Sequence, residues 1–345
     1  MQKKTYKASG PGELALLERI RARAAASGGP GLRLGDLRLG IGDDCALLRV
    51  KAGEELAVTT DLSLAGRHFR LDWHPPESVG HRTLARGLSD LAAMGARPVA
   101  AFLSLGLPPE LTRKQGRGKP WVDRFFDGFL ALAQAFDTPL AGGDLAESPL
   151  AAADIVLLGS VPRGRALLRS GARPGDLLYV TGTPGGAAAG LELLAGQAGA
   201  GRPAASLPKS VREQLAPHLF PQPRVRQGLW LQRRVVATAA LDLSDGLSTD
   251  LAHLCEESGV AAEVESAALP VHTGASLTQA LHGGEDYELL FTAAPGTRVP
   301  RSIAGVKVTR IGRIVTRRRR GPRVRLVTPD GSQPLEPHGW EHFSG

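Results

Sequence analysis

The stretch Asp242-Leu243-Ser244-Asp245-Gly246 joins an apolar run, residues 237–243, to a run of helical periodicity, residues 247–258. The first run is typical of a buried strand and the second of a helix with one apolar face. The same order recurs at residues 176–181, which a Gly-rich turn at residues 182–186 connects to an Ala/Leu-rich helix. Because strands and helices interleave in this way, the sequence predicts a fold of α/β or α+β layers.

Acidic residues recur in this chain beside Gly, Ser and Thr rather than among other charged residues. A single Asp in such a place is more often a helix cap or a turn residue. Six such motifs at the ends of apolar runs favour carboxylates that converge on a cation, and Mg²⁺ takes oxygen ligands of this kind together with substrate phosphates. The motifs are Gly42-Asp43-Asp44, Thr59-Thr60-Asp61, Leu88-Ser89-Asp90-Leu91, Gly142-Gly143-Asp144, Asp242-Leu243-Ser244-Asp245-Gly246 and Gly283-Gly284-Glu285-Asp286-Tyr287.

The length of 345 residues allows about two domains. The pattern of elements breaks at Pro162-Arg163-Gly164, so we predict one domain of residues 1–162 and another of residues 163–345. In the first domain we expect helices at residues 11–26 (capped by Ser9), 77–94 and 121–136, and strands at residues 56–60, 99–105 and 153–161. In the second we expect a further strand at residues 287–291 and a β-meander or hairpin over residues 306–327.

The net charge of +8 comes from one local run of arginines. Eight of the 42 basic residues lie in residues 310–325, which contain no acid, and the other 34 balance the 34 acidic residues. We interpret residues 317–320 as a solvated hairpin tip. An RNA-binding protein is the alternative from another class, but no aromatic residues for base stacking lie nearby, so we expect no nucleic-acid partner.

No apolar run is long enough to span a bilayer, so we expect a cytoplasmic protein without a membrane partner. The two cysteines, Cys45 and Cys255, provide neither a disulfide framework nor, without clustered His, a zinc site. The Gly-rich turn at residues 182–186 lacks the Lys of a P-loop. Close strand–helix packing is therefore the favoured interpretation of this turn, and a phosphate at the helix N-terminus is the alternative.

The acidic motifs, in this order, resemble those of thiamine-monophosphate kinase over about residues 12 to 343. His68-Phe69 and the closing Gly339-Trp340-Glu341-His342-Phe343 complete the resemblance. This family belongs to the aminoimidazole ribonucleotide synthetase superfamily. The resemblance therefore implies an N-terminal α/β domain that forms a homodimer and a C-terminal α+β domain. Two stretches depart from the family, an Arg/Lys/Gly-rich one at residues 112–120 and a longer loop at residues 196–208.

The resemblance also implies a reaction, the phosphorylation of thiamine monophosphate by ATP with several Mg²⁺ ions, and a set of site residues. Implied metal ligands are Asp44, Thr59, Thr60, Asp61, Asp90, Asp144, Asp242 and Asp245, of which Asp90, Asp144 and Asp242 would be catalytic. Implied ATP contacts are Trp121 (against adenine), Gly143, Asp144, Arg169 and Ser244, and implied thiamine phosphate contacts are His68, Glu285 and Trp340. Taken alone, His68 and Arg169 also fit surface residues, and Trp340 fits a residue that seals the C-terminus against the core.

The chemistry of the residues agrees with that reaction. Both substrates are polyanions, which an aspartate-lined site holds only through metal ions. The acceptor is a phosphate whose second pKa is near ~6, so it is already largely dianionic at neutral pH and needs no general base. Direct in-line transfer is then expected. The cationic thiazolium ring requires an aromatic face or a carboxylate, and Trp340 and Glu285 are residues of those types.

Other members of the superfamily fit less well. Selenophosphate synthetase needs a reactive Cys or selenocysteine near its N-terminus, and residues 1–44 contain no Cys. The hydrogenase-maturation relative ends in Cys, whereas this chain ends in His342-Phe343-Ser344-Gly345. Aminoimidazole ribonucleotide synthetase is the nearest enzymatic alternative, and the motifs at Glu285 and Trp340 point away from it.

Overall fold

The computed structural model describes residues 13–27, 37–39, 41, 45–114, 118–199, 204 and 207–339. Ser9, Asp44 and Trp340 lie outside the described residues. The chain divides into two compact units, of which unit 1 comprises Met1–Lys51, Thr60–Leu84 and Pro98–Leu158. Unit 2 comprises Ala52–Thr59, Ala85–Arg97 and Gly159–Gly345. The boundary predicted between residues 162 and 163 stays a prediction.

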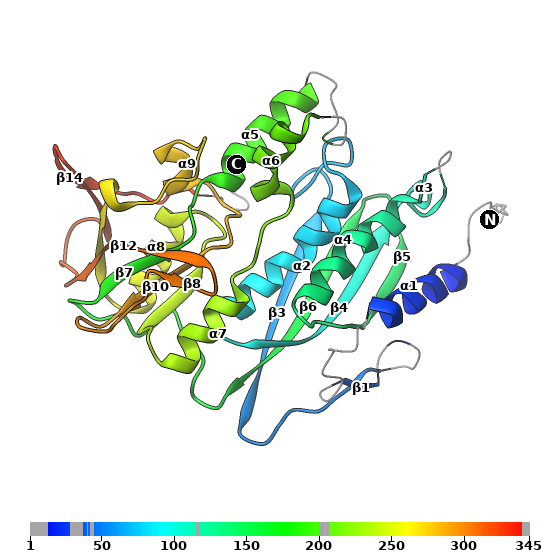
Figure 1. Cartoon of the computed structure of the whole chain (residues 1–345), viewed down its shortest axis with the longest axis horizontal. Coiled ribbons are helices and arrows are strands. Elements are labelled where there is room, and N and C mark those ends of the chain that lie inside the picture. Colours follow the sequence, from blue (N-terminus) through cyan, green and yellow to red (C-terminus); the bar gives the residue numbers. More distant parts are fainter. Residues whose placement is uncertain are drawn as a thin grey trace, which may run out of the picture. The chain divides into compact units, whose positions relative to one another are not determined.

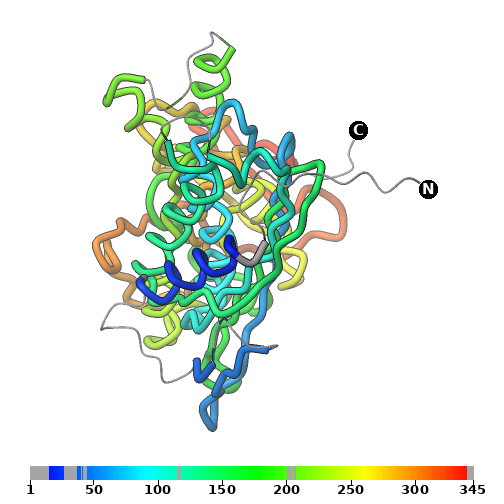
Figure 2. Tube along the Cα trace, turned by 90° about the vertical axis from the view of Figure 1, so that its right-hand side faces the viewer, coloured from blue at the N-terminus to red at the C-terminus, as the bar shows by residue number. Residues whose placement is uncertain are grey.

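A four-stranded sheet carries the N-terminal motifs. Its order is β3 (Glu54–Leu64), β6 (Ala152–Pro162), β4 (Arg97–Leu107) and β5 (Leu140–Glu147), with β4 and β5 parallel. Helices α2 (Pro76–Ala93) and α4 (Trp121–Ala135) cover one face of it (Figures 1 and 2). The expected strand at residues 56–60 is therefore too short, because β3 continues to Leu64 and Asp61 lies inside it rather than at its end.

Helices α2 and α4 pack closely because small and aromatic residues alternate where they meet. A Cβ on Gly128 would lie 1.8 Å from the carbonyl oxygen of Glu77, so only glycine allows this approach. Phe125 and Phe129 on α4 are fully buried, and their ring centroids lie 6.3 Å apart. The short strands β1 (Leu37–Leu39) and β2 (Leu47–Leu48) pack on the sheet through Leu37 and Leu48.

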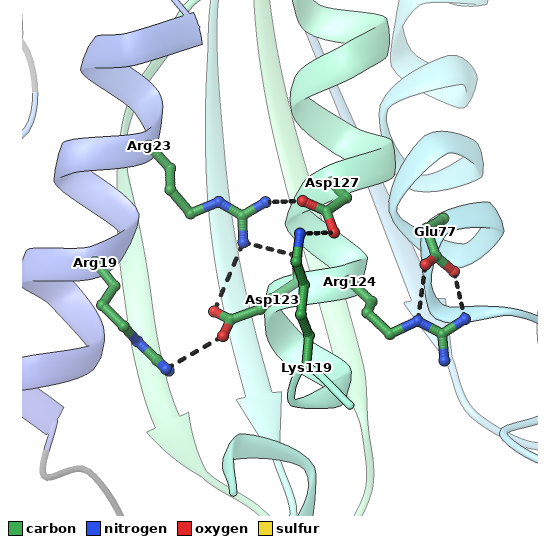
Figure 3. A network of polar contacts seen from close by, with 7 residues as sticks. All are labelled: Arg19, Arg23, Glu77, Lys119, Asp123, Arg124 and Asp127. Atoms are coloured by element: carbon green, nitrogen blue, oxygen red, sulfur yellow. Dashed lines mark hydrogen bonds and ion pairs between the residues drawn. The ribbon is translucent and has the colours of Figure 1, made fainter. Parts of the chain in front are cut away.

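A network of charged side chains joins α1 (Glu13–Ser27) to α4 (Figure 3). Arg19 pairs with Asp123 at 3.2 Å, and Arg23 pairs with Asp127 at 2.5 Å. Lys119 contacts the second oxygen of Asp127 at 3.0 Å. The pairs are partly exposed, so each contributes at most about 1 kcal/mol, and the buried Leu16 and Ile20 provide the apolar part of the α1 contact.

Unit 2 is built on an eight-stranded sheet. The order is β14 (Gly331–Pro334), β13 (Val324–Thr328), β9 (Ala261–Glu265), β12 (Val306–Val315), β7 (Leu177–Thr181), β10 (Leu289–Ala293) and β8 (Ala239–Asp242), and β11 (Ser302–Ile303) pairs with β12. Helix α8 (Leu247–Glu257) buries Leu251 and Leu254 in the same core as Val180 and Leu290. Unit 2 also contains α5 (Gly186–Gly199), α6 (Lys209–Leu219), α7 (Val225–Arg234), α9 (Leu277–His282) and the 3₁₀ turn Ser266–Ala268. The short helix α3 (Pro109–Thr112) belongs to unit 1.

Two expectations about this sheet are wrong. Strands β12 and β13 do not form a hairpin, because β9 lies between them and β13 runs parallel to β9. Residues 317–320 therefore belong to a crossover connection, although they are exposed as expected. Tyr287 does not begin a strand, because its φ of 50° places it in a turn, and β10 starts at Leu289. No helix in the described part of the chain is long and apolar enough to cross a bilayer.

A buried ion pair joins Arg224, just before α7, to Glu288, the residue that precedes β10. Arg224 donates two hydrogen bonds to the carboxylate of Glu288, at 2.6 and 2.5 Å, and Glu288 is only 4% exposed. Thr181 donates a third bond to the same carboxylate at 2.7 Å. Removing one partner of such a pair leaves an uncompensated buried charge.

We therefore expect Arg224→Met to lower the free energy of unfolding by about 3 to 5 kcal/mol, measured by urea denaturation. Arg224→Met combined with Glu288→Leu removes both charges and should recover much of that loss. A loss below about 1 kcal/mol in the single variant, or no recovery in the double variant, would contradict this account of the pair.

Candidate active site

Two acidic motifs from distant parts of the sequence meet at the C-terminal half of α2. The helix buries Leu84, Leu88 and Leu91 on one face, which leaves Asp90 half-buried at the edge of that face. Ser89 Oγ donates a hydrogen bond of 2.6 Å to Oδ2 of Asp242, the last residue of β8. Thr59 Oγ1, on β3, donates to Oδ2 of Asp90. Three predicted metal ligands of unit 2 are thus brought together.

The electrostatics of Asp90 show that this arrangement carries like charges. Although the residue is only half-buried, loss of hydration around its carboxylate raises the pKa of Asp90 to about 7, with the negative charge of Asp242 as the second cause. The hydrogen bond from Thr59 and the positive charges of Arg169 and Arg86 act in the opposite direction. Ionised together, Asp90 and Asp242 destabilise the folded protein unless a cation joins them.

The loop after β8 is held by the carboxylate of Asp250, a residue that the sequence patterns did not identify as part of the site. Oδ2 of Asp250 accepts hydrogen bonds from the backbone N–H groups of Ser244, Asp245 and Gly246, at 3.1, 3.1 and 3.0 Å. Burial raises the pKa of Asp250 well above its usual range, and the charges of Asp242 and Asp245 add to the shift. This loop carries the predicted ATP contact Ser244 and the predicted metal ligand Asp245. Asp250, on the helix that follows the loop, therefore holds the loop in place.

The segment carrying Glu285 is bonded to the same loop. The N–H of Glu285 donates to the carbonyl of Ser244 at 2.8 Å, and the N–H of Tyr287 donates to the carbonyl of Leu243 at 2.9 Å. The carboxylate of Glu285 lies 3.7 Å from Nδ1 of the buried His218. A predicted acceptor contact and a predicted ATP contact thus share one backbone framework in unit 2.

Arg169 also belongs to unit 2, whereas several other predicted residues lie in unit 1. Thr60 and Asp61 follow each other on β3, and Gly143 and Asp144 lie on β5. Gly143 has a φ of +149°, and a Cβ there would lie 1.9 Å from the carbonyl oxygen of Leu103, so the position requires glycine. Asp144 is exposed, and its carboxylate accepts the N–H of Leu145 at 2.9 Å.

His68 has one nitrogen engaged with its own turn. Its Nδ1 accepts the backbone N–H of Leu64 at 3.0 Å. A neutral imidazole bonded in this way carries its proton on Nε2 and presents a donor there. The geometry suits hydrogen bonding to an anionic oxygen better than proton abstraction.

A cavity of about 710 Å³ lies beside Trp121, between the ends of α2, α3 and α4. Its lining includes Leu71, Leu111 and the ion pair of Arg124 with Glu77. Trp121 stacks on Phe125 at a centroid distance of 5.5 Å, and no described residue accepts a hydrogen bond from its indole N–H. The cavity is large enough for a nucleotide base.

The oxygen donors of unit 2 suit Mg²⁺, which protein sites commonly bind through one or two carboxylates plus substrate phosphates. Asp90, Asp242 and the hydroxyl of Thr59 form such a partial set. Among the described residues, no three His, Cys, Asp or Glu side chains converge closely enough to hold a metal ion by themselves. Asp44 cannot be placed, because it lies outside the described part of the chain.

Two N–H groups at the Gly-rich turn before α5 are bound by a carboxylate of the protein. The carboxylate of Asp286 accepts the N–H of Gly185 at 2.6 Å and the N–H of Ala187 at 3.1 Å. The packing interpretation of this turn is thus supported. The position of Asp286 in an acidic motif pointed to a ligand site, and only the tertiary structure reveals its contact with α5.

Two sequence profiles match the chain in tandem. The one described as AIR synthase related protein, N-terminal domain, matches residues 42–161, and the corresponding C-terminal domain matches residues 173–325. Together with the carboxylate-lined loops, these matches define an AIR synthase-related protein of two domains, as expected.

Individual proteins narrow the assignment. Thiamine-monophosphate kinase of Salmonella typhimurium is 42% identical over 315 residues, covering 88% of this chain and 90% of that protein. The crystal structure of thiamine-monophosphate kinase from Stenotrophomonas maltophilia has a TM-score of 0.76 and 40% identity, covering 91% of this chain and 96% of that one. A structure of AaThiL complexed with AMPPCP and TMP has a TM-score of 0.72 and 30% identity, covering 99% of both chains. The chain belongs to the thiamine-monophosphate kinase family.

The repulsion between Asp90 and Asp242 predicts an unusual effect on stability. In metal-free buffer at pH 8, Asp90→Asn should raise the melting temperature, by about 2 to 4 °C for each kcal/mol of repulsion removed. Mg²⁺ should stabilise the wild type and have less effect on the variant. A lower melting temperature for metal-free Asp90→Asn, or equal stabilisation of both proteins by Mg²⁺, would contradict this interpretation of the carboxylate pair.

Proposed function

We propose that this chain transfers the γ-phosphoryl group of ATP directly to the phosphate of thiamine monophosphate, giving thiamine diphosphate and ADP, with several Mg²⁺ ions bound. Family membership supports the ATP-dependent reaction, and the AMPPCP and TMP bound to AaThiL are of the two kinds of ligand it needs. The observation that carries the metal-assisted mechanism is the pair of like-charged carboxylates, Asp90 and Asp242, held by the hydroxyls of Thr59 and Ser89.

The proposed metal ligands are the oxygen donors of the acidic motifs. In unit 2 these are Thr59, Asp90, Asp242 and Asp245, and the family resemblance adds Asp44, Thr60, Asp61 and Asp144. When bound, Mg²⁺ neutralises charge on the phosphates and on the transferred group. The scaffold contributes by holding the carboxylates in place beforehand, since Ser89, Thr59 and Asp250 fix them or their loops.

Nucleotide and acceptor contacts are assigned separately. We assign Trp121, Gly143, Asp144, Arg169 and Ser244 to ATP, and the cavity beside Trp121 supports a place for adenine in unit 1. We assign His68, Glu285 and Trp340 to thiamine phosphate. The Nε2–H expected on His68 is suited to a phosphate oxygen, and the carboxylate of Glu285 is suited to the cationic thiazolium.

No residue needs to remove a proton from the acceptor, because its phosphate is largely dianionic at neutral pH. The work of the protein is then to position two phosphates in line and to exclude water from them. This agrees with the engagement of Nδ1 of His68 by the backbone N–H of Leu64.

A homodimer is part of the proposal. β3 lies at the edge of its sheet, and Leu56, Val58 and Leu62 are 44%, 56% and 48% exposed. Alternate residues of a strand share one face, so these three form an apolar stripe on the sheet. Stripes of this kind mark protein interfaces, and a second copy of this chain is the partner that the family resemblance implies.

The function is tested by incubating the purified protein with thiamine monophosphate, ATP and Mg²⁺ and separating thiamine diphosphate by chromatography. Asp90→Asn should lower kcat by on the order of 100- to 1000-fold. The reason is that the variant lacks a metal ligand, and the metal ion neutralises charge where the phosphates meet. Asp72→Asn is the matched control, since Asp72 is exposed and pairs with the equally exposed Arg70. Absence of thiamine diphosphate with the wild type would refute the function, and near-normal kcat in Asp90→Asn would refute the metal assignment.

The pH dependence tests the absence of a general base. With Mg²⁺ and both substrates saturating, the rate should rise through the second pKa of the acceptor phosphate, near ~6, and then level off. His68→Gln should keep the same profile with a raised KM for thiamine monophosphate. A steep dependence in the wild type that disappears in His68→Gln would show that this histidine acts as a base.

A further inference from the structure

The four residues after Gly284 form a turn that is fixed at every position. Glu285 and Tyr287 are tied through their backbone N–H groups to the loop after β8, at 2.8 and 2.9 Å. Tyr287 and Glu288 are each 4% exposed, and Glu288 is bonded to Arg224. Asp286 reaches in another direction, to the first turn of α5. Glu285 is the half-buried member of the turn that we assign to the acceptor.

The backbone of this turn adopts a conformation that side-chain-bearing residues avoid. Glu285 has a φ of 65° and Tyr287 a φ of 50°, so both residues that flank Asp286 are left-handed. Such positions persist only where the surrounding structure holds them, and they cluster at functional sites. The hydrogen bonds that hold Asp286, the residue between them, therefore help to set the direction in which the side chain of Glu285 points.

Asp286 contacts the start of α5 through two hydrogen bonds to its carboxylate. Its two carboxylate oxygens accept the N–H groups of Gly185 and Ala187, one oxygen to each. A carboxylate at a helix N-terminus satisfies unpaired N–H groups and interacts favourably with the helix dipole. Loss of hydration raises the pKa of Asp286 to about 7; the two N–H bonds oppose this shift, and the nearby charges of Glu288 and Glu285 add to it. The carboxylate is thus kept at this place against an electrostatic cost.

We propose that Asp286 is a positioning residue for the acceptor: by binding the N-terminus of α5 it locks the left-handed turn that presents Glu285 to thiamine monophosphate. The inference rests on the proposed function, because it takes Glu285 as an acceptor contact. It gives the Gly-rich turn at residues 182–186 a role as the partner of Asp286. Asp286 itself touches neither substrate in this account.

Asp286→Asn tests the proposal with little change in shape. An amide has one acceptor oxygen, so at least one of the two N–H bonds is lost. We expect KM for thiamine monophosphate to rise about tenfold, while KM for ATP changes less than twofold. A role in folding alone would lower the melting temperature and leave both KM values unchanged. If Asp286→Asn does not fold, Asp286→Glu keeps the charge but displaces the carboxylate, and the same selective rise is expected.

Asp176 provides a matched control. It is 3% exposed, and its Oδ2 accepts the N–H of Arg173 at 2.9 Å and the hydroxyl of Thr238 at 2.7 Å. It precedes β7, whereas the partners of Asp286, Gly185 and Ala187, lie beyond the other end of that strand. Asp176→Asn should lower the melting temperature and leave KM for thiamine monophosphate unchanged.

Hydrogen exchange adds a readout that needs no substrate. Peptides covering residues 183–188 and 283–289 should both lose protection in Asp286→Asn and keep it in Asp176→Asn. An unchanged KM for thiamine monophosphate in Asp286→Asn, beside a raised KM in Glu285→Gln, would overturn the inference and leave the proposed function standing. Equal rises of KM in the Asp286 and Asp176 variants would also overturn it. Failure of the wild type to form thiamine diphosphate would refute the function, and the exchange experiment would still test the lock between the two segments.

Discussion

Repulsion between carboxylates is the constraint on which the rest of unit 2 depends. Asp90 and Asp242 carry like charges in a place where hydration is reduced, and Asp245 and Asp250 add to the negative potential. Neutral side chains at these positions would give the protein a higher free energy of unfolding. The protein instead surrounds these groups with donors, namely the hydroxyls of Thr59 and Ser89 and three backbone N–H groups. Such an arrangement suits the metal ions and phosphates that we propose to bind there.

Four buried or half-buried acidic residues of unit 2 show two different kinds of contact. Asp250 and Asp286 accept backbone N–H groups and so fix loops, while Asp90 and Asp242 accept hydroxyls and interact electrostatically with each other. A carboxylate that accepts backbone N–H groups loses mobility and gives rigidity to its loop. Carboxylates that fix loops and carboxylates that we assign to ligands therefore occur close together in unit 2.

The sequence predicted the elements that depend on local pattern and missed those that depend on distant pairing. α4 was expected from the helical periodicity of residues 121–136, and the two domains of the family from the order of the motifs. The pairing of β13 with β9 was not predictable, because neighbouring strands in a chain usually pair with each other and here an earlier strand lies between them. Asp250 and Asp286 could be recognised as acids near ligand loops, but their backbone partners are set by the fold. For Asp44 and Trp340, which lie outside the described residues, the family resemblance remains the only argument.

The most direct test of the central claim is a count of the metal ions that these carboxylates bind. Mn²⁺ can replace Mg²⁺ at oxygen-ligand sites and is followed by electron paramagnetic resonance as free ion is depleted. With the non-hydrolysable analogue AMPPCP present, the wild type should bind more than one Mn²⁺ per chain, and Asp90→Asn should bind fewer ions or bind them at least tenfold more weakly. Equal stoichiometry and affinity in the two proteins would contradict the claim that the paired carboxylates of unit 2 form a metal site.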